Sequence, residues 1–233
     1  MKVAALGTGM VGQAIAGKLA ELGHEVVVGT RDPEETMART EPDYLGNPPF
    51  PAWKEAHPGV ALSTPAEAAA KAELVVNATN GAGSIAMLEA AGEENLTGKL
   101  LVDVANPLDV SQGLPPSLFV CNTDSLGEQI QRRFPQARVV KALNTMNCQV
   151  MVDPSRVPGE HDAFLCGEDA TAKQQVGELL QSFGWPAERI RDLGGISSAR
   201  GMEMYIALWV RLWGTLGTGD FNIAVVHAPA NLS

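Results

Sequence analysis

A glycine-rich turn lies within the first twelve residues of the chain. It reads Gly7-Thr8-Gly9-Met10-Val11-Gly12, which is the spacing Gly-x-Gly-x-x-Gly. In dinucleotide-binding turns of this spacing, the first glycine permits the bend, the second lets the backbone approach the pyrophosphate, and the third allows close helix–strand packing. The turn follows an apolar run and opens a helical pattern, so helix N–H groups would point at the anion. These six residues are predicted to bind a dinucleotide pyrophosphate; a glycine turn without a ligand is the alternative.

The end of the second predicted strand indicates which dinucleotide is bound. NAD-binding chains usually carry Asp or Glu there, about 20 residues after the turn, to accept a hydrogen bond from the ribose 2′-hydroxyl. Here the position reads Gly29-Thr30-Arg31. Thr30 can donate to a 2′-phosphate, and Arg31 can pair with the phosphate while stacking on adenine. NADP(H) is therefore the predicted cofactor. Asp32, a carboxylate next to this position, leaves NAD as an alternative, and the alternative role of Arg31 is that of a surface arginine without a ligand.

Three amide-rich turns follow later predicted strands. They read Thr79-Asn80-Gly81, Ala105-Asn106-Pro107 and Asn144-Thr145-Met146-Asn147. Because ligands of open parallel sheets bind at the carboxyl ends of the strands, these turns are expected near the nicotinamide or a second substrate. Ordinary turn chemistry explains the same residues equally well, since Asn, Gly and Pro favour turns. The residues predicted to contact ligand are Thr79, Asn80, Ala105, Asn106 and Asn144.

The sequence offers no dedicated acid, base, nucleophile or metal cluster. The four histidines are isolated, and no Ser-His-Asp, His-Glu-x-x-His, Ser-Tyr-Lys or paired-carboxylate pattern is evident. The three cysteines show no Cys-x-x-Cys pair, which fits a reducing compartment. We therefore expect no metal site and leave the catalytic residues unassigned, because hydride transfer between two ring systems depends mainly on positioning.

The elements that would position these turns alternate between apolar runs and helical patterns. Strands separated by helices of this length predict an α/β chain with a Rossmann-type, doubly wound parallel sheet. The proline-rich stretch from Pro42 to Pro58 is expected to be an irregular loop with one helical turn at most. Thr64-Pro65-Ala66-Glu67 predicts a capping box and helix start. The six predicted strands span residues 2–6, 25–29, 60–62, 74–78, 99–104 and 138–143.

The alternation changes near residue 150. We predict an NADP-binding domain over residues 1–150 and a small C-terminal α/β domain for substrate binding or dimerisation over residues 151–233. A long apolar helix from Ala199 to Leu216 and a terminal strand from Asn222 to Val226 are expected in the second part. Trp209 and Trp213 lie one turn apart on that helix and are expected in a core or a dimer interface rather than on a binding platform.

Composition excludes several classes of partner. The formal net charge of −10 disfavours nucleic acid and anionic membranes, so an anionic cofactor requires a local positive site. No apolar stretch is long enough to span a bilayer, and no secretory leader is evident. A cytoplasmic protein that acts on small redox molecules is expected.

The chain resembles the NADPH-dependent reductases of the deazaflavin coenzyme F420, whose Rossmann domain also occurs in STEAP-type metalloreductases. The landmarks, spread over nearly the whole chain, are residues 7–9, 28–31, 142–145, 166–169 and 192–195 leading into 199–200. The resemblance implies that Thr8, Thr30 and Arg31 contact the 2′-phosphate region, that the deazaflavin stacks on nicotinamide, and that the chain forms a homodimer. Asn80 and Asn144 depart from the family pattern, which expects a Thr-Ile-Pro-like turn around the first and a histidine at the second.

Three functions therefore stand side by side. The leading one is reversible hydride transfer between NADP(H) and coenzyme F420. The second is an NADPH-dependent reductase of another acceptor, such as a flavin, an imine or a ferric chelate, and it is motivated by Asn80 and Asn144. The third is a non-catalytic NADP(H)-binding redox sensor, which the lack of an acid or base would permit.

Overall fold

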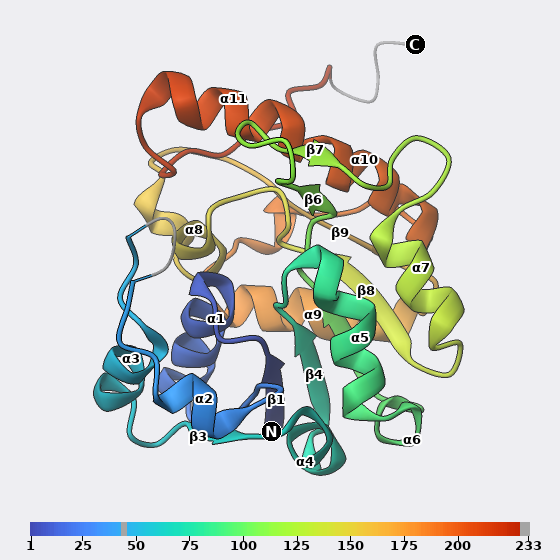
Figure 1. The fold of residues 1–233 in the computed structure, drawn as a ribbon. Helices are drawn as coiled ribbons and strands as arrows, with labels where there is room; N and C mark the ends of the chain where they lie inside the picture. The colour runs from blue at the N-terminus through green and yellow to red at the C-terminus, as the bar shows by residue number, and fades with distance from the viewer. Residues whose placement is uncertain (43–45, 229–233) are drawn as a thin grey trace.

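An eight-stranded sheet runs through the computed structural model, which describes residues 1–42 and 46–228 (Figure 1). The strand order is β10-β9-β8-β5-β4-β1-β2-β3, and the six strands from β8 to β3 are mutually parallel. This order reverses direction at β1 and β4, as in doubly wound dinucleotide-binding folds. The predicted Rossmann sheet is confirmed. Its parallel strands are β1 (Lys2–Leu6), β2 (Glu25–Gly29), β3 (Ala61–Ser63), β4 (Leu74–Asn77), β5 (Leu100–Asp103) and β8 (Arg138–Ala142).

Helices cover both faces of the sheet and bury two hydrophobic cores. Along β1, Val3 and Ala5 join one core while Ala4 and Leu6 join the other, because successive strand side chains point to opposite faces. The helices on the two faces are α1 (Met10–Glu21), α4 (Pro65–Lys71), α5 (Gly81–Ala91), α6 (Glu93–Leu96), α7 (Leu126–Arg133), α8 (Cys148–Val152) and α9 (Ala170–Ser182). Among the described residues, no helix has the length and apolar character needed to cross a bilayer.

Local sequence sets the start of α4 as predicted. The hydroxyl of Thr64 accepts a hydrogen bond from the backbone N–H of Glu67 at 3.4 Å, and the Glu67 carboxylate accepts one from the N–H of Thr64 at 3.3 Å. Pro65 occupies the first turn, where its missing N–H costs nothing.

The loop predicted between Pro42 and Pro58 contains a helix instead, α3 (Phe50–Ala56), and residues 43–45 of that stretch lie outside the described residues. The prolines sit at its N-cap (Pro49) and in its first turn, so they leave the rest of the helix intact. Phe50 is buried and packs 5.3 Å from the ring of Trp53, which ties α3 to the core. A shorter helix, α2 (Pro33–Met37), precedes it.

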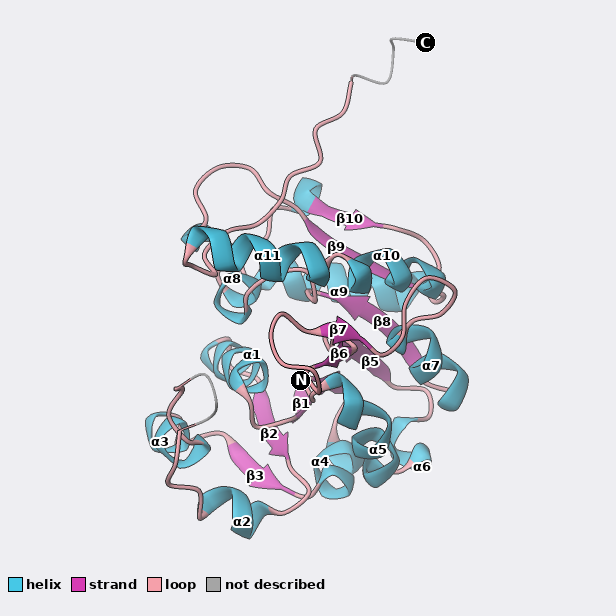
Figure 2. Ribbon diagram, turned by 45° about the horizontal axis from the view of Figure 1, so that its top comes forward, coloured by secondary structure: helices cyan, strands magenta, loops and turns pink. Residues whose placement is uncertain are grey.

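The C-terminal part extends the same sheet. Strand β9 (Ala163–Gly167) pairs antiparallel with β8, and β10 (Ile190–Asp192) pairs parallel with β9 (Figure 2). The division into domains 1–150 and 151–233 stays a prediction, and the two parts share one sheet. Short elements complete the chain, namely the two-stranded hairpin of β6 (Leu108–Asp109) and β7 (Ser117–Leu118) and the 3-10 turns Pro154–Arg156, Ala187–Arg189 and Ile196–Ser198.

The predicted helix from Ala199 to Leu216 forms as α10 (Ala199–Met204) and α11 (Ile206–Leu216). Tyr205 between them keeps helical dihedral angles (φ −58°, ψ −29°), so the two helices run on from one another. The predicted terminal strand from Asn222 to Val226 is wrong. The backbone N–H of Asp162 donates to the carbonyl oxygen of Ile223, but the N–H of Val225 donates to the side-chain carboxylate of Asp162. The backbone pairing therefore does not continue as a β-ladder.

Candidate active site

The glycine turn joins β1 to α1 in a geometry that only glycine fits at two positions. Gly7 has a φ of 121°, and a Cβ there would lie 2.6 Å from the carbonyl oxygen of Ala78. A Cβ on Gly12 would overlap the carbonyl oxygen of Gly7. Gly9, in contrast, has nothing within 4 Å of the place of a Cβ, and as N-cap of α1 it supplies no side chain to the helix N–H groups. The turn is therefore packed on its inner side and open on the side where an anion would bind.

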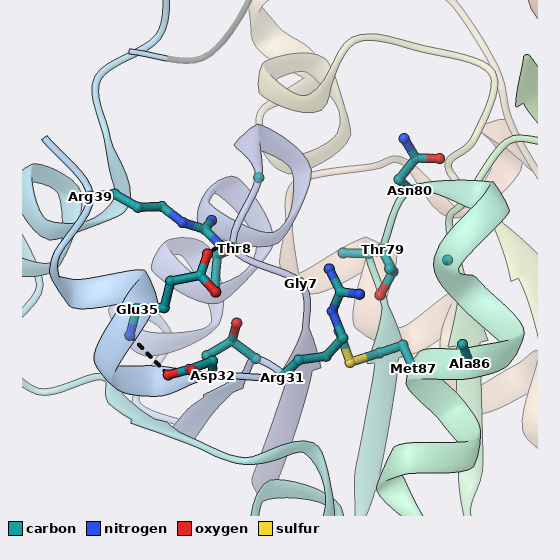
Figure 3. Close-up of a pocket in the computed structure, with 14 residues that line it drawn as sticks. Gly7, Thr8, Arg31, Asp32, Glu35, Arg39, Thr79, Asn80, Ala86 and Met87 are labelled. Carbon is teal, nitrogen blue, oxygen red and sulfur yellow. Dashed lines mark hydrogen bonds and ion pairs between the residues drawn. The ribbon is translucent and has the colours of Figure 1, made fainter. Parts of the chain in front are cut away.

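A first cavity of about 580 Å³ opens at this turn (Figure 3). It brings together predicted residues from the ends of three strands: the glycine turn after β1, Thr30 and Arg31 after β2, and Thr79 and Asn80 after β4. The carboxyl ends of these parallel strands meet at one edge, which explains the convergence. The full lining is Gly7, Thr8, Gly9, Thr30, Arg31, Asp32, Glu35, Arg39, Ala78, Thr79, Asn80, Gly83, Ala86 and Met87.

Two arginines line this cavity from opposite sides. The side chain of Arg31 extends toward Met87, whereas Arg39 lies beside Glu35 across the cavity, with 3.3 Å between its guanidinium and the carboxylate (Figure 3). Sequence reasoning missed Arg39, since it lies past the second strand, beyond α2, and no local motif includes it. The guanidinium groups of Arg31 and Arg39 are the cations of this cavity, and the carboxylates of Asp32 and Glu35 line it as well.

The structure also accounts for the polar residues next to Arg31. The carboxylate of Asp32 accepts the N–H of Glu35 at 2.8 Å and caps α2. Thr30 is buried, and its hydroxyl lies 2.9 Å from that of Thr36, so its side chain holds α2 against β2. Both residues line the cavity with their side chains engaged in placing α2.

A second cavity of about 420 Å³ shares one wall with the first, made of Gly9, Ala78, Thr79 and Asn80. Among the described residues that line it, none is Asp, Glu, Lys, Arg or His. Apolar groups and the carboxamides of Asn80, Asn106 and Asn147 surround the space. Cys148 is its titratable group, and burial raises the pKa of that thiol. The remaining lining is Met10, Val11, Gly81, Val104, Ala105, Leu108, Val110, Met146, Met151 and Trp209.

Asn144, which is predicted to contact a ligand, bonds to a residue that lines the second cavity. It is buried and absent from the described lining of both cavities, and its side chain instead bonds to Asn106 at 2.9 Å. Its direct contact with a ligand stays a prediction, while its contact with Asn106 shapes the second cavity. Trp209 enters that cavity from α11 and stacks on Phe221 with ring centroids 5.3 Å apart, whereas the neighbouring Trp213 is exposed.

A cluster of buried charges lies behind the second cavity, and the sequence reading passed over it. The ammonium group of Lys141 lies 2.8 Å from the carboxylate of Asp103 and 2.7 Å from that of Glu203, and all three side chains are buried. The signal was a lysine inside the apolar strand Val139-Val140-Lys141-Ala142. A lysine in a strand buried on both faces requires a partner charge. One such partner, Glu203, is 62 residues away in sequence.

Comparisons with known proteins agree with this geometry. The family model described as "NADP oxidoreductase coenzyme F420-dependent" matches residues 2–107. The F420-dependent NADP reductase of Methanothermobacter marburgensis is 27% identical over 223 residues, which cover 91% of this chain and 92% of that protein. The metalloreductase STEAP3 of Rattus norvegicus is also 27% identical, over 87% of this chain, but the chain spans only 36% of its length.

A solved structure from Arthrobacter sp. FB24, provisionally named an F420-dependent NADP reductase, is 58% identical. It superposes with a TM-score of 0.92 over 97% of this chain and 100% of the other. The imine reductase of Streptomyces aurantiacus is 19% identical with a TM-score of 0.61, covers 93% of this chain and 63% of that one, and shares the fold. The chain therefore belongs to the family of coenzyme F420-dependent NADP oxidoreductases and is an NADP-dependent oxidoreductase.

Proposed function

We propose that this protein transfers a hydride reversibly between NADP(H) and coenzyme F420. The observation that carries the proposal is the shared wall of the two cavities, made of Gly9, Ala78, Thr79 and Asn80. A dinucleotide held along the glycine turn would extend from the first cavity past this wall, and the second cavity would then receive the ring of the acceptor. When bound, the nicotinamide supplies the hydride and the deazaflavin accepts it.

The first cavity fits the adenosine end of NADP(H). Arg31 and Arg39 provide two cations for the 2′-phosphate, and the open side of Gly9 together with the first N–H groups of α1 suits the pyrophosphate. Asp32 does not argue for NAD, because its carboxylate caps α2. We therefore assign Arg31 and Arg39 to the 2′-phosphate, with Thr8 and Thr30 lining the same region of the cavity, and Gly7 to Gly12 to the pyrophosphate.

The second cavity suits a flat, uncharged ring. Its walls are apolar side chains with carboxamides from Asn80, Asn106 and Asn147, which can hydrogen-bond the carbonyl and N–H groups of a heterocycle. A conjugated ring that takes up a hydride spreads the added charge over its own carbonyls, so the protein needs to orient it rather than protonate it. Thr79, Asn80, Ala105 and Asn106 are the residues that we place at the junction of the two rings.

Reduction of an imine is less well supported by the same cavity. That reaction leaves a basic nitrogen that gains a proton, and a dedicated donor would be expected near it. The titratable group among the described lining residues is the Cys148 thiol, whose pKa is raised by burial. Reduction of a ferric chelate is suggested by the likeness to STEAP3. This chain spans 36% of the length of that protein, so the likeness gives this reaction less support.

We also propose that the protein forms a homodimer. Apolar side chains are exposed together on α11 and on the neighbouring β6–β7 hairpin, which lie side by side in both views (Figures 1 and 2). The most exposed of them are Leu208, Trp213 and Leu216 on the helix and Val110, Leu114 and Phe119 around the hairpin. Light scattering of the purified protein tests this, and a monomer at all concentrations would remove it.

The test of the reaction is an anaerobic assay of the purified protein with NADPH and oxidised F420, followed by the loss of deazaflavin absorbance. Rapid bleaching that disappears in Arg31→Ala at low NADPH supports the proposal. Parallel assays with free flavin, a cyclic imine and ferric citrate identify the acceptor if F420 is inert. Tight NADPH binding with no turnover on any acceptor would favour the redox sensor.

A further inference from the structure

The buried charge cluster behind the second cavity joins three separate elements. Lys141 comes from β8, Asp103 from the end of β5 and Glu203 from α10, and the exposed fractions of their side chains are 0%, 0% and 2%. The ammonium group also donates to the carbonyl oxygen of Ala105, at 2.5 Å. All three N–H donors of Lys141 therefore have a partner, and each partner lies on a segment next to the site.

One arm of the cluster fixes the wall made by Ala105 and Asn106. The Ala105 N–H donates to Oδ1 of Asp103 at 3.2 Å, while the Ala105 carbonyl accepts from Lys141. Asp103 is held in turn by the side chain of Asn77, at 2.9 Å. The backbone of Ala105 is thus bound on both sides, directly under the second cavity that it lines.

The other arm fixes α10, which runs on into the helix that carries Trp209. Besides Lys141, the carboxylate of Glu203 accepts the backbone N–H groups of Leu126 at 2.8 Å and Gly127 at 3.0 Å, which docks α10 on the start of α7. Helical hydrogen bonding continues through Tyr205, whose carbonyl accepts the N–H of Trp209 at 3.0 Å. The position of Glu203 is therefore transmitted to Trp209, which also lines the second cavity.

Stability alone does not explain such a cluster. Burying three charges costs desolvation that their attraction often only offsets, and apolar residues of similar volume can serve as well or better. Burial opposes the charge of Lys141, but Asp103 and Glu203 outweigh it and raise the pKa of the lysine, so it stays protonated and does not exchange protons with substrate. What the charges add beyond apolar packing is direction, because each hydrogen bond fixes one segment relative to the same nitrogen atom.

We propose that Lys141 is a positioning residue that sets the separation between the Ala105–Asn106 wall and the Trp209 wall of the second cavity, with Asp103 and Glu203 as its two anchors. The inference rests on the proposed function, since it concerns the geometry in which the acceptor ring meets the nicotinamide. A small error in that geometry lowers the rate of hydride transfer steeply while the distant 2′-phosphate site is unaffected.

Glu203→Gln and Asp103→Asn, each made in the full chain, test the proposal because they preserve shape and remove one anchor charge. Arg200→Gln is the matched control: Arg200 forms an ion pair of 2.6 Å with Glu128 between the same two helices, α10 and α7, outside the cluster. The measurements are the NADPH dissociation constant, the KM for oxidised F420, and the single-turnover rates with unlabelled NADPH and with NADPH deuterated at C4. The ratio of these two rates is the isotope effect.

Each anchor variant is expected to slow hydride transfer about tenfold or more with NADPH affinity changed by less than about twofold, and to keep a full isotope effect. Arg200→Gln should leave the rate within about twofold, because a partly exposed pair contributes little. Equal rates in wild type and both anchor variants, or parallel losses of rate and NADPH affinity, would overturn the proposal. A wild type that never reduces F420 would instead refute the proposed function.

Discussion

The side chains of Asn106 and Asn144 hold one another across the carboxyl edge of the sheet. Nδ2 of Asn144 donates to Oδ1 of Asn106 at 2.9 Å, and Nδ2 of Asn106 donates to the backbone oxygen of Asn144 at 2.7 Å. The turn after β5 is thereby tied to the turn after β8. Only Asn106 lines the second cavity, so Asn144 shapes the site through its partner.

Replacing either asparagine by alanine should lower the free energy of unfolding by about 1–3 kcal/mol, because it leaves a buried polar group unpaired. Since the two residues share their hydrogen bonds, the double variant should cost less than the sum of the single ones. A double-mutant cycle in urea should give a coupling energy of about 1 kcal/mol or more. Additive losses would show that the pair does not act as a unit.

Arg31→Ala is expected to weaken NADPH binding about tenfold or more and to leave NADH binding nearly unchanged, because a charge-assisted bond to the 2′-phosphate is lost. Arg39→Ala should have a smaller effect, since Glu35 already pairs with this arginine. Fluorescence titrations with both nucleotides measure the difference. Equal losses for NADPH and NADH would contradict the assignment of the first cavity.

Two glycines on the first turn of α5 should respond oppositely to alanine. A Cβ on Gly81 would overlap the carbonyl oxygen of Asn106, so Gly81→Ala should destabilise the protein by about 1–3 kcal/mol and disturb the second cavity. A Cβ on Gly83 would lie 3.5 Å from the Thr79 methyl group, an ordinary contact, so Gly83→Ala should be neutral or stabilising by up to about 1 kcal/mol. Urea unfolding of both variants measures these changes in the free energy of unfolding. An unchanged stability in Gly81→Ala would show that the turn can shift.

One of the three cysteines should react with a thiol reagent at pH 8. Cys121 is exposed, whereas burial raises the pKa of Cys148 and raises that of Cys166 to about 12. A raised pKa keeps these two thiols protonated, and only the thiolate reacts. Native protein should therefore show a single fast thiol that disappears in Cys121→Ser, and denatured protein should show all three. Fast labelling in the Cys121→Ser variant would mean that a buried thiol opens to solvent.

Acid should remove a small part of the stability through Asp124. Hydrogen bonds from the Arg132 guanidinium, at 2.9 and 2.7 Å, lower the pKa of this carboxyl to about 2 from a usual 3.8. A depressed pKa adds stability above pH 3.8 that is lost as the pH falls toward 2. Because Arg132 is largely exposed, Asp124→Asn should cost about 0.5 kcal/mol or less at pH 7. The difference between variant and wild type should vanish near pH 2, and a constant difference would exclude this pair as its source.

The features that local sequence specifies were predicted well. The glycine turn, the capping box of Thr64 and Glu67, and the six parallel strands each depend on residues close together in the chain, where spacing alone carries the information. The family assignment followed from short motifs spread over nearly the whole chain and is confirmed. Helix α3 was not predicted because a run of prolines favours a loop, although Pro49 and Pro51 stand where a helix tolerates proline.

The features that depend on distant residues could not be read in this way. Arg39 reaches the first cavity only because α2 folds back beside β2, and the side chain of Asn144 bonds to Asn106, 38 residues away in sequence. The partner of Lys141 is a glutamate in α10, which no spacing rule connects to β8. A single sequence indicates that such a lysine needs a counter-charge but does not say which carboxylate provides it.

The anchoring of Glu203 also bears on how such chains can be recombined. The matched family model ends at residue 107, which invites the view that everything beyond it is a replaceable attachment. Yet a chimera that exchanges the last third of the chain between relatives would pair the β8 lysine with whatever stands at position 203 of the donor. In this chain, such an exchange keeps the buried ion pair of Lys141 only when the donor segment supplies a carboxylate at position 203.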